Sequence, residues 1–196
     1  MGFYEFARGV TRGFCKVAYH ITFEGLENIP ADGGYVLCSN HRSYLDPVFV
    51  GIRLRQRLHF MAKKELFRNR FFGALISKLG AFPVEKGKDG GEAIEKAEAV
   101  IRDKKVFAIF PEGTRSKTGE LLRLRSGALV VAAQTGADIL PVTVNFQGKL
   151  RFRTRVVIRY GDMISHEKLG LTEASPKQLR QANKLLTETM LGLLHM

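Results

Sequence analysis

A histidine and an aspartate five residues apart are the residues best suited to chemistry in this sequence. They belong to the segment NHRSYLDP, residues 40–47, which follows an apolar run over 35–39 that is typical of a buried strand. A neutral imidazole accepts a proton near pH 7, and a nearby carboxylate fixes its tautomer and stabilises the imidazolium that forms. The pattern therefore indicates a general base, His41, oriented by Asp46.

The same segment also has a purely structural interpretation. An aspartate followed by a proline is a common helix start, with the aspartate as cap and the proline at the first helical position. Ser43 and Asp46 are also spaced as in a capping box. The spacing alone leaves catalysis and capping open.

A second group of polar residues, EGTR at 112–115, follows another apolar run, 106–110. Gly113 allows close backbone approach, so its N–H can meet a ligand oxygen, and Arg115 offers a guanidinium fork that suits phosphate. Lys86, and Arg123 or Arg125, would add charge to such a site. The alternative is a solvated turn with a Glu–Arg ion pair, which contributes little to stability.

Apolar segments with strand character alternate with helical segments along the chain. This alternation predicts an α/β fold, with a mixed, mostly parallel sheet covered by helices on both faces. Ligands of such sheets bind outside the carboxyl ends of strands, so His41 and the turn 112–115 are predicted to share one cleft. The expected strands are 19–25, 35–39, 58–62, 81–87, 106–110, 139–145 and 155–160, and the expected helices are 47–53, 65–79, 92–102, 127–135 and one beginning at 176.

Residues 3–18 have the period of an amphipathic helix. An aromatic face backed by cations is typical of a helix at a membrane interface, although a helix that packs on its own domain shows the same pattern. We predict a membrane-interface helix over 1–19 and a single α/β domain over 20–196. The apolar face comprises Phe3, Phe6, Val10, Phe14 and Val17, and the opposite face Glu5, Arg8, Arg12 and Lys16.

Composition narrows the possible partners. The chain of 196 residues has a net charge of +12, which calls for nucleic acid, a membrane surface or a phosphorylated substrate. Its two cysteines argue against a disulfide framework and fit a reducing cytoplasm, and its five histidines lack ligand spacing, so no metal site is expected. No segment approaches the ~20 apolar residues that span a bilayer, and charged residues interrupt any signal peptide.

The two polar segments together resemble a known family. Residues 40–47 and FPEGTRS at 110–116 are similar to the first and third motifs of the lysophosphatidic acid acyltransferases, the 1-acylglycerol-3-phosphate O-acyltransferase or PlsC family. GAFPVEK at 80–86 resembles the second motif and LPV at 140–142 the fourth, so the resemblance covers about residues 20–165. The family usually has arginine where Lys86 stands, and lysine loses the bidentate fork.

The resemblance implies a single-step acyl transfer without a metal or redox cofactor. His41 would take the proton from the sn-2 hydroxyl of lysophosphatidic acid (1-acylglycerol 3-phosphate), while Asp46 holds the imidazole. The hydroxyl oxygen would attack a thioester of acyl carrier protein or coenzyme A, and backbone N–H groups would stabilise the oxyanion. The product would be phosphatidic acid, made at the cytoplasmic face of the cell membrane by a peripheral enzyme on an anionic membrane surface.

The resemblance also implies roles for the residues that bind the acceptor. Arg115 and Lys86 would hold the phosphate, and Glu112 would contact either a glycerol hydroxyl or Arg115. The implied substrate-binding set is Lys86, Glu112, Gly113, Thr114 and Arg115.

Three alternatives stay open. Cys38 or Ser43 would serve as a covalent acyl carrier in a two-step reaction. A relative within the superfamily would use glycerol 3-phosphate or another lysolipid, although Thr114 favours lysophosphatidate, because the glycerol 3-phosphate branch tends to have a second glycine there. A nucleic-acid-binding module would explain the charge and the alternating arginines 151, 153 and 155, but no nucleic-acid signature accompanies them, so no nucleic acid is expected.

Overall fold

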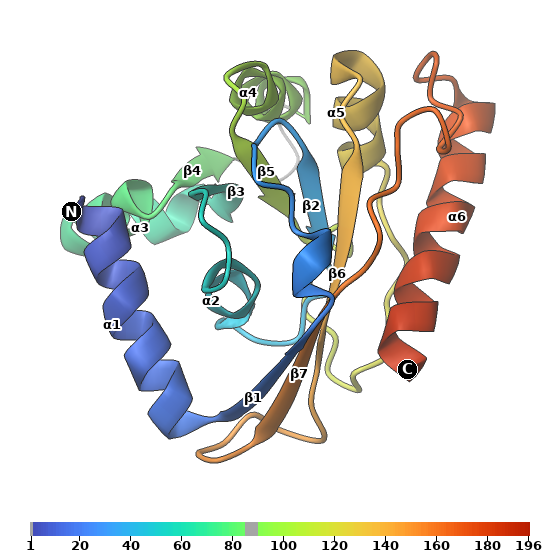
Figure 1. Cartoon of the computed structure of the whole chain (residues 1–196). Helices are drawn as coiled ribbons and strands as arrows, with labels where there is room; N and C mark the ends of the chain where they lie inside the picture. Colours follow the sequence, from blue (N-terminus) through green and yellow to red (C-terminus); the bar gives the residue numbers. More distant parts are fainter. Residues whose placement is uncertain (1, 85–89) are drawn as a thin grey trace.

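A mixed sheet forms the centre of the fold (Figure 1). The structure, a computed structural model, describes residues 2–84 and 90–196, and within them seven strands pair in the order β1-β7-β6-β2-β5-β3-β4. Only β6 and β7 pair antiparallel, which confirms the predicted mostly parallel sheet. The strands are β1 (His20–Glu24), β2 (Val36–Ser39), β3 (Leu58–Lys63), β4 (Ala81–Val84), β5 (Val106–Ile109), β6 (Ile139–Asn145) and β7 (Arg155–Tyr160).

Helices cover both faces of the sheet, as predicted (Figure 1). Successive side chains of a strand point to opposite faces, so Val36 and Cys38 of β2 pack under α4, α5 and α6, whereas Leu37 packs under α2. Burial on both sides explains why β2 is continuously apolar. The helices of this layer structure are α1 (Phe3–Ala18), α2 (Asp46–Gly51), α4 (Gly90–Arg102), α5 (Gly127–Thr135) and α6 (Pro176–His195), with a short 3₁₀ helix, η1 (Leu26–Asn28).

The sheet register brings the two polar segments together. β2 pairs parallel with β5, with Cys38 opposite Ile109, and on its other side with β6, with Ser39 opposite Val142. The carboxyl ends of parallel neighbours lie at the same edge, so the loops that follow β2 and β5 leave the sheet side by side.

The segment 65–79 is not the single core helix that its periodicity predicted. It divides into a 3₁₀ helix, η2 (Lys64–Phe67), and α3 (Arg70–Lys78), because the Asn69 side chain accepts hydrogen bonds from the first turn of α3. Phe71 is 90% exposed, and Leu66, Phe72 and Leu75 are also exposed. Periodicity identifies an apolar face, but it does not show whether another element covers that face.

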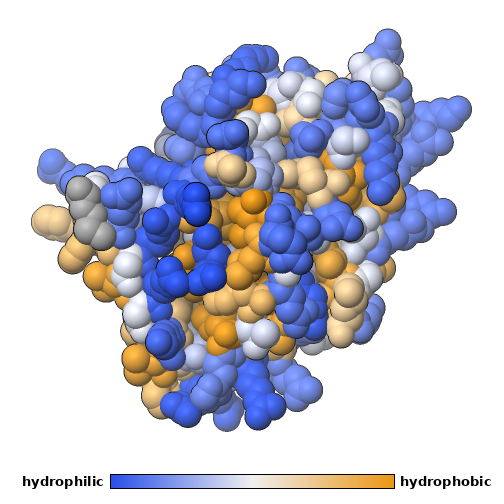
Figure 2. Space-filling view, in the orientation of Figure 1, coloured by the Kyte–Doolittle hydropathy of each residue, from blue (hydrophilic) through white to orange (hydrophobic). Residues whose placement is uncertain are grey.

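The aromatic face of α1 points away from the body. Its large apolar side chains are 46–69% exposed, and Figure 2 shows hydrophobic groups along the outer flank of this helix. A different face, with Cys15 and Ala18 buried, contacts the domain. Arg8, on the face opposite the aromatic one, contacts the domain, because its guanidinium donates to the carbonyls of Leu54 and Arg55. No helix within the described residues is long and apolar enough to cross a membrane.

We expect Gly25→Ala to destabilise the fold more than Gly136→Ala does. Both glycines have a positive φ, +69° and +68°, so each alanine bears a backbone cost of about 1–2 kcal/mol. At Gly25 the added Cβ would also lie 2.0 Å from the carbonyl oxygen of Tyr160, whereas at Gly136 it would meet open space. Urea unfolding should therefore show a further loss of about 1–3 kcal/mol for Gly25→Ala. Equal losses would contradict this account of the turn.

Candidate active site

The His41 imidazole and the Asp46 carboxylate form the centre of the site. Nδ1 of His41 lies 2.7 Å from Oδ2 of Asp46, whose side chain is fully buried, while the His41 side chain is 21% exposed. An ionised carboxylate only accepts hydrogen bonds, so Nδ1 carries the proton and Nε2 keeps its lone pair. The two side chains are thus arranged as a base and its orienting acid.

The Asp46 carboxylate also shapes the loop that holds the histidine. Oδ2 accepts hydrogen bonds from the backbone N–H groups of Arg42 (2.6 Å) and Ser43 (2.7 Å). These donors precede α2, so the side chain does not cap that helix, although Pro47 does stand in its first turn. The hydrogen bond from the Ser43 N–H to Asp46 is one half of the capping box that the spacing suggested. The other half is not formed, because the Ser43 hydroxyl accepts from the N–H of Leu45, at 3.1 Å, and not from that of Asp46.

Two residues that the sequence did not single out hold His41 in place. The Phe110 ring stacks on the imidazole, with centroids 4.3 Å apart and planes at 22°. The buried Asn40 amide donates to the carbonyl of Val144 (3.0 Å) and accepts from its N–H (2.7 Å), which fixes the loop to β6. Asn40 is the first residue of segment 40–47 and Phe110 the first of segment 110–116, and this was the only signal available for either residue.

Glu112 is buried and joins two loops rather than facing solvent. Oε1 accepts from the N–H of His41 at 2.6 Å, and Oε2 accepts from the N–H of Leu122 at 2.8 Å. Burial raises the pKa of Glu112, although both backbone hydrogen bonds act in the opposite direction. Within the described part of the chain it forms no ion pair with Arg115, so the alternative of a solvated turn with a Glu–Arg ion pair is not what the structure contains.

The backbone at Gly113 is used within the protein. Its N–H donates to the carbonyl of Phe110 at 3.0 Å, its φ is +67°, and an added Cβ would lie 2.9 Å from Nε of Arg125. The Arg125 side chain therefore occupies the space that the absence of a Cβ leaves at Gly113. The next residue, Thr114, is exposed.

Arg115 lies at the rim of the site, stacked on an aromatic ring. Its guanidinium carbon is 3.6 Å from the ring centroid of Tyr44, which is 77% exposed. A guanidinium stacked in this way keeps its N–H donors, which lie in the plane of the group, available for an anion. The remaining predicted phosphate contact, Lys86, lies outside the described residues.

The two loops are tied to each other and to β6. The Ser116 N–H donates to the His41 carbonyl at 2.7 Å. The Arg42 guanidinium lies 4.0 Å from the centroid of the Phe146 ring and donates to the Phe146 carbonyl. Burial lowers the pKa of Arg42, while the nearby Asp46 charge opposes that shift. The base is therefore held by backbone and side-chain contacts from three neighbouring strand ends.

The cysteine considered as an acyl carrier is a core residue. Cys38 is fully buried within β2, and burial raises the pKa of its thiol. A protonated, inaccessible thiol is a poor nucleophile. The arrangement instead suits removal of a proton from a hydroxyl group on an anionic substrate, with His41 as base and Arg115 as the nearby cation.

Comparison with known proteins agrees with this chemistry. The chain is 32% identical over 146 residues to the 1-acyl-sn-glycerol-3-phosphate acyltransferase of Bacillus subtilis (strain 168), covering 74% of this chain and 71% of the relative. It is 28% identical over 190 residues to the enzyme of that name from Streptococcus pneumoniae, covering 95% and 67%. The crystal structure of PlsC, the 1-acyl-sn-glycerophosphate (LPA) acyltransferase from Thermotoga maritima, shares the fold, with a TM-score of 0.73 at 24% identity, covering all of this chain and 83% of that one.

A family model described as Acyltransferase matches residues 20–145. That range contains the His41–Asp46 pair, the turn 112–115 and the strands β1 to β6 that position them. This chain therefore belongs to the acyltransferase family.

Proposed function

We propose that this protein transfers a fatty acyl group from a thioester to the sn-2 hydroxyl of 1-acyl-sn-glycerol 3-phosphate, giving phosphatidic acid for phospholipid synthesis. The observation that carries the proposal is the 2.7 Å contact between His41 Nδ1 and the buried Asp46 carboxylate. The names of the relatives from Bacillus subtilis and Streptococcus pneumoniae support the choice of acceptor. Glycerol 3-phosphate or another lysolipid is the alternative acceptor.

In the proposed reaction, Nε2 of His41 removes the proton of the acceptor hydroxyl as its oxygen attacks the thioester carbonyl. A carbon–oxygen bond forms, the carbon–sulfur bond breaks, and the imidazolium returns its proton to the departing thiolate. Asp46 stabilises the imidazolium, and backbone N–H groups at the site stabilise the oxyanion. The thiol released belongs to acyl carrier protein or coenzyme A.

The acceptor phosphate binds Arg115, and Lys86 adds charge at the same end of the substrate. The Tyr44 ring supports the Arg115 guanidinium at 3.6 Å. Thr114 and Gly113 contribute the shape of the rim beside Arg115. Glu112 positions His41 by accepting a hydrogen bond from its backbone N–H.

Membrane attachment follows from the kind of substrate. We assign it to residues 1–19, with the α/β domain over 20–196 held at the cytoplasmic face of the cell membrane as a peripheral enzyme. Phe6 and Phe14 are 61% and 58% exposed on the outward face of α1, while Arg12 and Lys16, exposed on the opposite face, reach anionic headgroups. Each basic residue near such a surface contributes about 1 kcal/mol, and salt weakens the attraction.

We expect His41→Ala and Asp46→Asn each to lower turnover ~10²–10⁴-fold while the fold persists. The asparagine side chain would still offer an oxygen to the loop N–H groups, but its neutral amide would no longer stabilise an imidazolium. Steady-state rates with lysophosphatidate and an acyl thioester, alongside circular dichroism, measure the effect. Cys38→Ala should keep activity, because the thiol is buried. Near-wild-type turnover of His41→Ala would reject the general base.

Arg115→Ala should impair use of the acceptor and leave affinity for the thioester largely unchanged. A charge-assisted hydrogen bond to phosphate contributes about 1.5–3 kcal/mol, so kcat/KM for lysophosphatidate should fall accordingly. Lys86→Ala should act in the same direction but less, since lysine makes no bidentate contact. Kinetics with each substrate varied decide the assignment, with Arg180→Ala as the control because this arginine is also exposed but lies on α6. A defect confined to the thioester would overturn it.

The double substitution Phe6→Glu with Phe14→Glu should sharply reduce binding to anionic vesicles. Both side chains point away from the domain, so the fold and turnover on a short-chain, soluble lysolipid should survive. Ala174→Glu with Gln181→Glu adds the same charge at exposed positions on the other side of the sheet and should leave sedimentation with vesicles unchanged. Unimpaired sedimentation of the phenylalanine variant would show that α1 does not attach the protein.

A further inference from the structure

The loop that joins β6 to β7 carries an exposed aromatic side chain among exposed cations that the proposed function does not use. Phe152 is 71% exposed. Arg151 and Arg153 lie in this loop, and Arg155 begins β7, the strand predicted over 155–160. Lys149 adds a fourth exposed cation. Within the residues that the structure describes, none of these four cations forms an ion pair.

A tight turn presents Phe152 at its tip. The Thr154 N–H donates to the Arg151 carbonyl at 3.1 Å, and the Arg151 N–H donates to the Thr154 hydroxyl oxygen at 2.8 Å. Arg153, third in the turn, has φ of +62°, a conformation that usually selects glycine or asparagine. Leu150 packs against the core beneath α2 and anchors the loop. The chain thus keeps a cation at a strained position beside an exposed aromatic ring.

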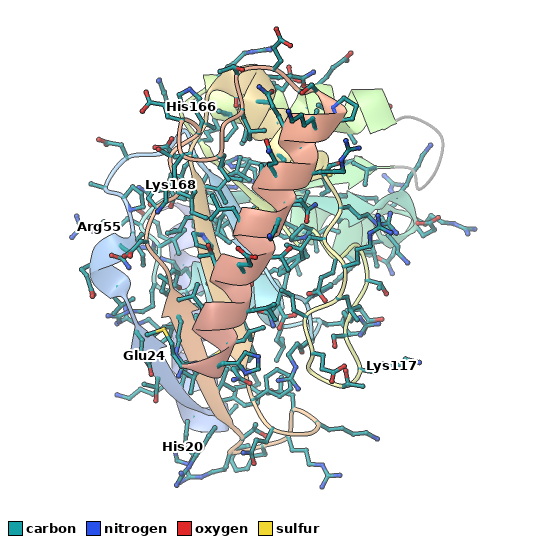
Figure 3. All side chains as sticks on the ribbon, turned by 90° about the vertical axis from the view of Figure 1, so that its right-hand side faces the viewer. His20, Glu24, Arg55, Lys117, His166 and Lys168 are labelled. Atoms are coloured by element: carbon teal, nitrogen blue, oxygen red, sulfur yellow. The ribbon has the colours of Figure 1, made fainter. Side chains whose placement is uncertain are left out.

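The turn is attached to the end of α1. The Arg153 N–H donates to the Ala18 carbonyl at 2.6 Å, and the His20 N–H donates to the Thr154 carbonyl at 3.1 Å. Figure 1 shows this loop beside the end of α1, and Figure 3 shows His20 at the same end of the molecule. The nearest outward residues of α1, Phe14 and Val17, are themselves more than half exposed. Phe152 therefore lies in a turn that is hydrogen-bonded to the end of α1, where the outward apolar face of that helix ends.

The other end of the loop reaches the candidate active site. The loop begins after β6 at Phe146, whose ring lies under the Arg42 guanidinium at 4.0 Å. Arg42 follows the base directly in sequence, and its backbone N–H is bound by Asp46. One short segment therefore spans from the outward face of α1 to the loop that carries His41.

We propose that residues 149–155 form a second membrane contact, in which Phe152 enters the headgroup region and the surrounding cations bind the phosphates of anionic phospholipids. With α1, this contact would turn the His41 edge of the sheet toward the bilayer, where the lipid acceptor resides. The inference rests on the proposed function, which supplies the need for that orientation. A single protruding ring, continuous with α1 and surrounded by cations, matches a lipid surface better than the extended interface of an acidic protein.

The charge contribution is tested by Arg153→Gly against Lys104→Gly. Lys104 is also exposed and has a positive φ, +56°, so each variant loses one charge and one strained residue. Lys104 differs in position, because it precedes β5 at the opposite edge of the sheet. Partition of the full chain into vesicles of phosphatidylcholine with phosphatidylglycerol should weaken about fivefold for Arg153→Gly, and about 25-fold with Arg151→Gln added. Lys104→Gly should stay within twofold of wild type.

The apolar contribution is tested by Phe152→Ser. Partition should weaken about tenfold into both anionic and pure phosphatidylcholine vesicles, whereas Arg153→Gly should matter only for the anionic ones. All loop variants should keep wild-type turnover on a short-chain, soluble acceptor. Because glycine suits the turn at position 153, weaker partition of that variant would not come from unfolding.

Two results would overturn the inference. One is equal partition of Arg153→Gly and Lys104→Gly into anionic vesicles. The other is unchanged vesicle partition of the loop variants together with a raised KM for an acyl carrier protein thioester, which would make the loop a protein-docking site. Partition is measured without turnover. Failure of the proposed acyl transfer would therefore appear separately, as a wild-type protein that binds vesicles but does not acylate lysophosphatidate.

Discussion

The buried carboxylate of Asp46 is the constraint on which the site depends. An ionised group removed from water is costly unless hydrogen bonds replace its hydration. Here the imidazole of His41 and two backbone N–H groups meet one oxygen of this carboxylate at 2.6–2.7 Å. The loop after β2 must fold tightly to bring these donors together, so the need to satisfy the carboxylate also determines the direction of the imidazole. The imidazole is oriented before any substrate binds, and in the proposed reaction this lowers the entropic cost.

A second buried carboxylate connects this loop to the rest of the edge. Glu112 bridges the N–H groups of His41 and Leu122, so the segments after β2 and β5 hold each other. The antiparallel pairing of β6 with β7 then matters for function, because it reverses β7 and β1. The beginnings of β1 and β7, with the end of α1, therefore lie at the edge where β2, β5 and β6 end. One end of the sheet thus carries both the base and the surfaces assigned to lipid.

The division of α1 into faces is an energetic feature as well as a geometric one. Small side chains, Cys15 and Ala18, contact the domain, while the phenylalanines of the helix point to solvent. Burying a phenylalanine side chain is worth about 1.5–3 kcal/mol, and the isolated fold does not gain that free energy here. Aromatic residues are exposed on α1, on α3 and on the β6–β7 loop, and the chain has a net charge of +12. These two properties suit contact with an anionic, partly apolar environment.

Local patterns in the sequence were enough to predict most strand and helix positions and the pairing of His41 with Asp46, because periodicity and five-residue spacing are short-range properties. Only the tertiary structure decided that Glu112 binds the His41 backbone, that Phe110 stacks on the imidazole and that Arg42 reaches Phe146. Those contacts join residues about 70 to 100 positions apart, and they depend on which strands pair and in which register. The same holds for α1 and α3: each sequence shows an apolar face, but whether the domain covers that face depends on where the helix docks, and no local pattern encodes the docking position.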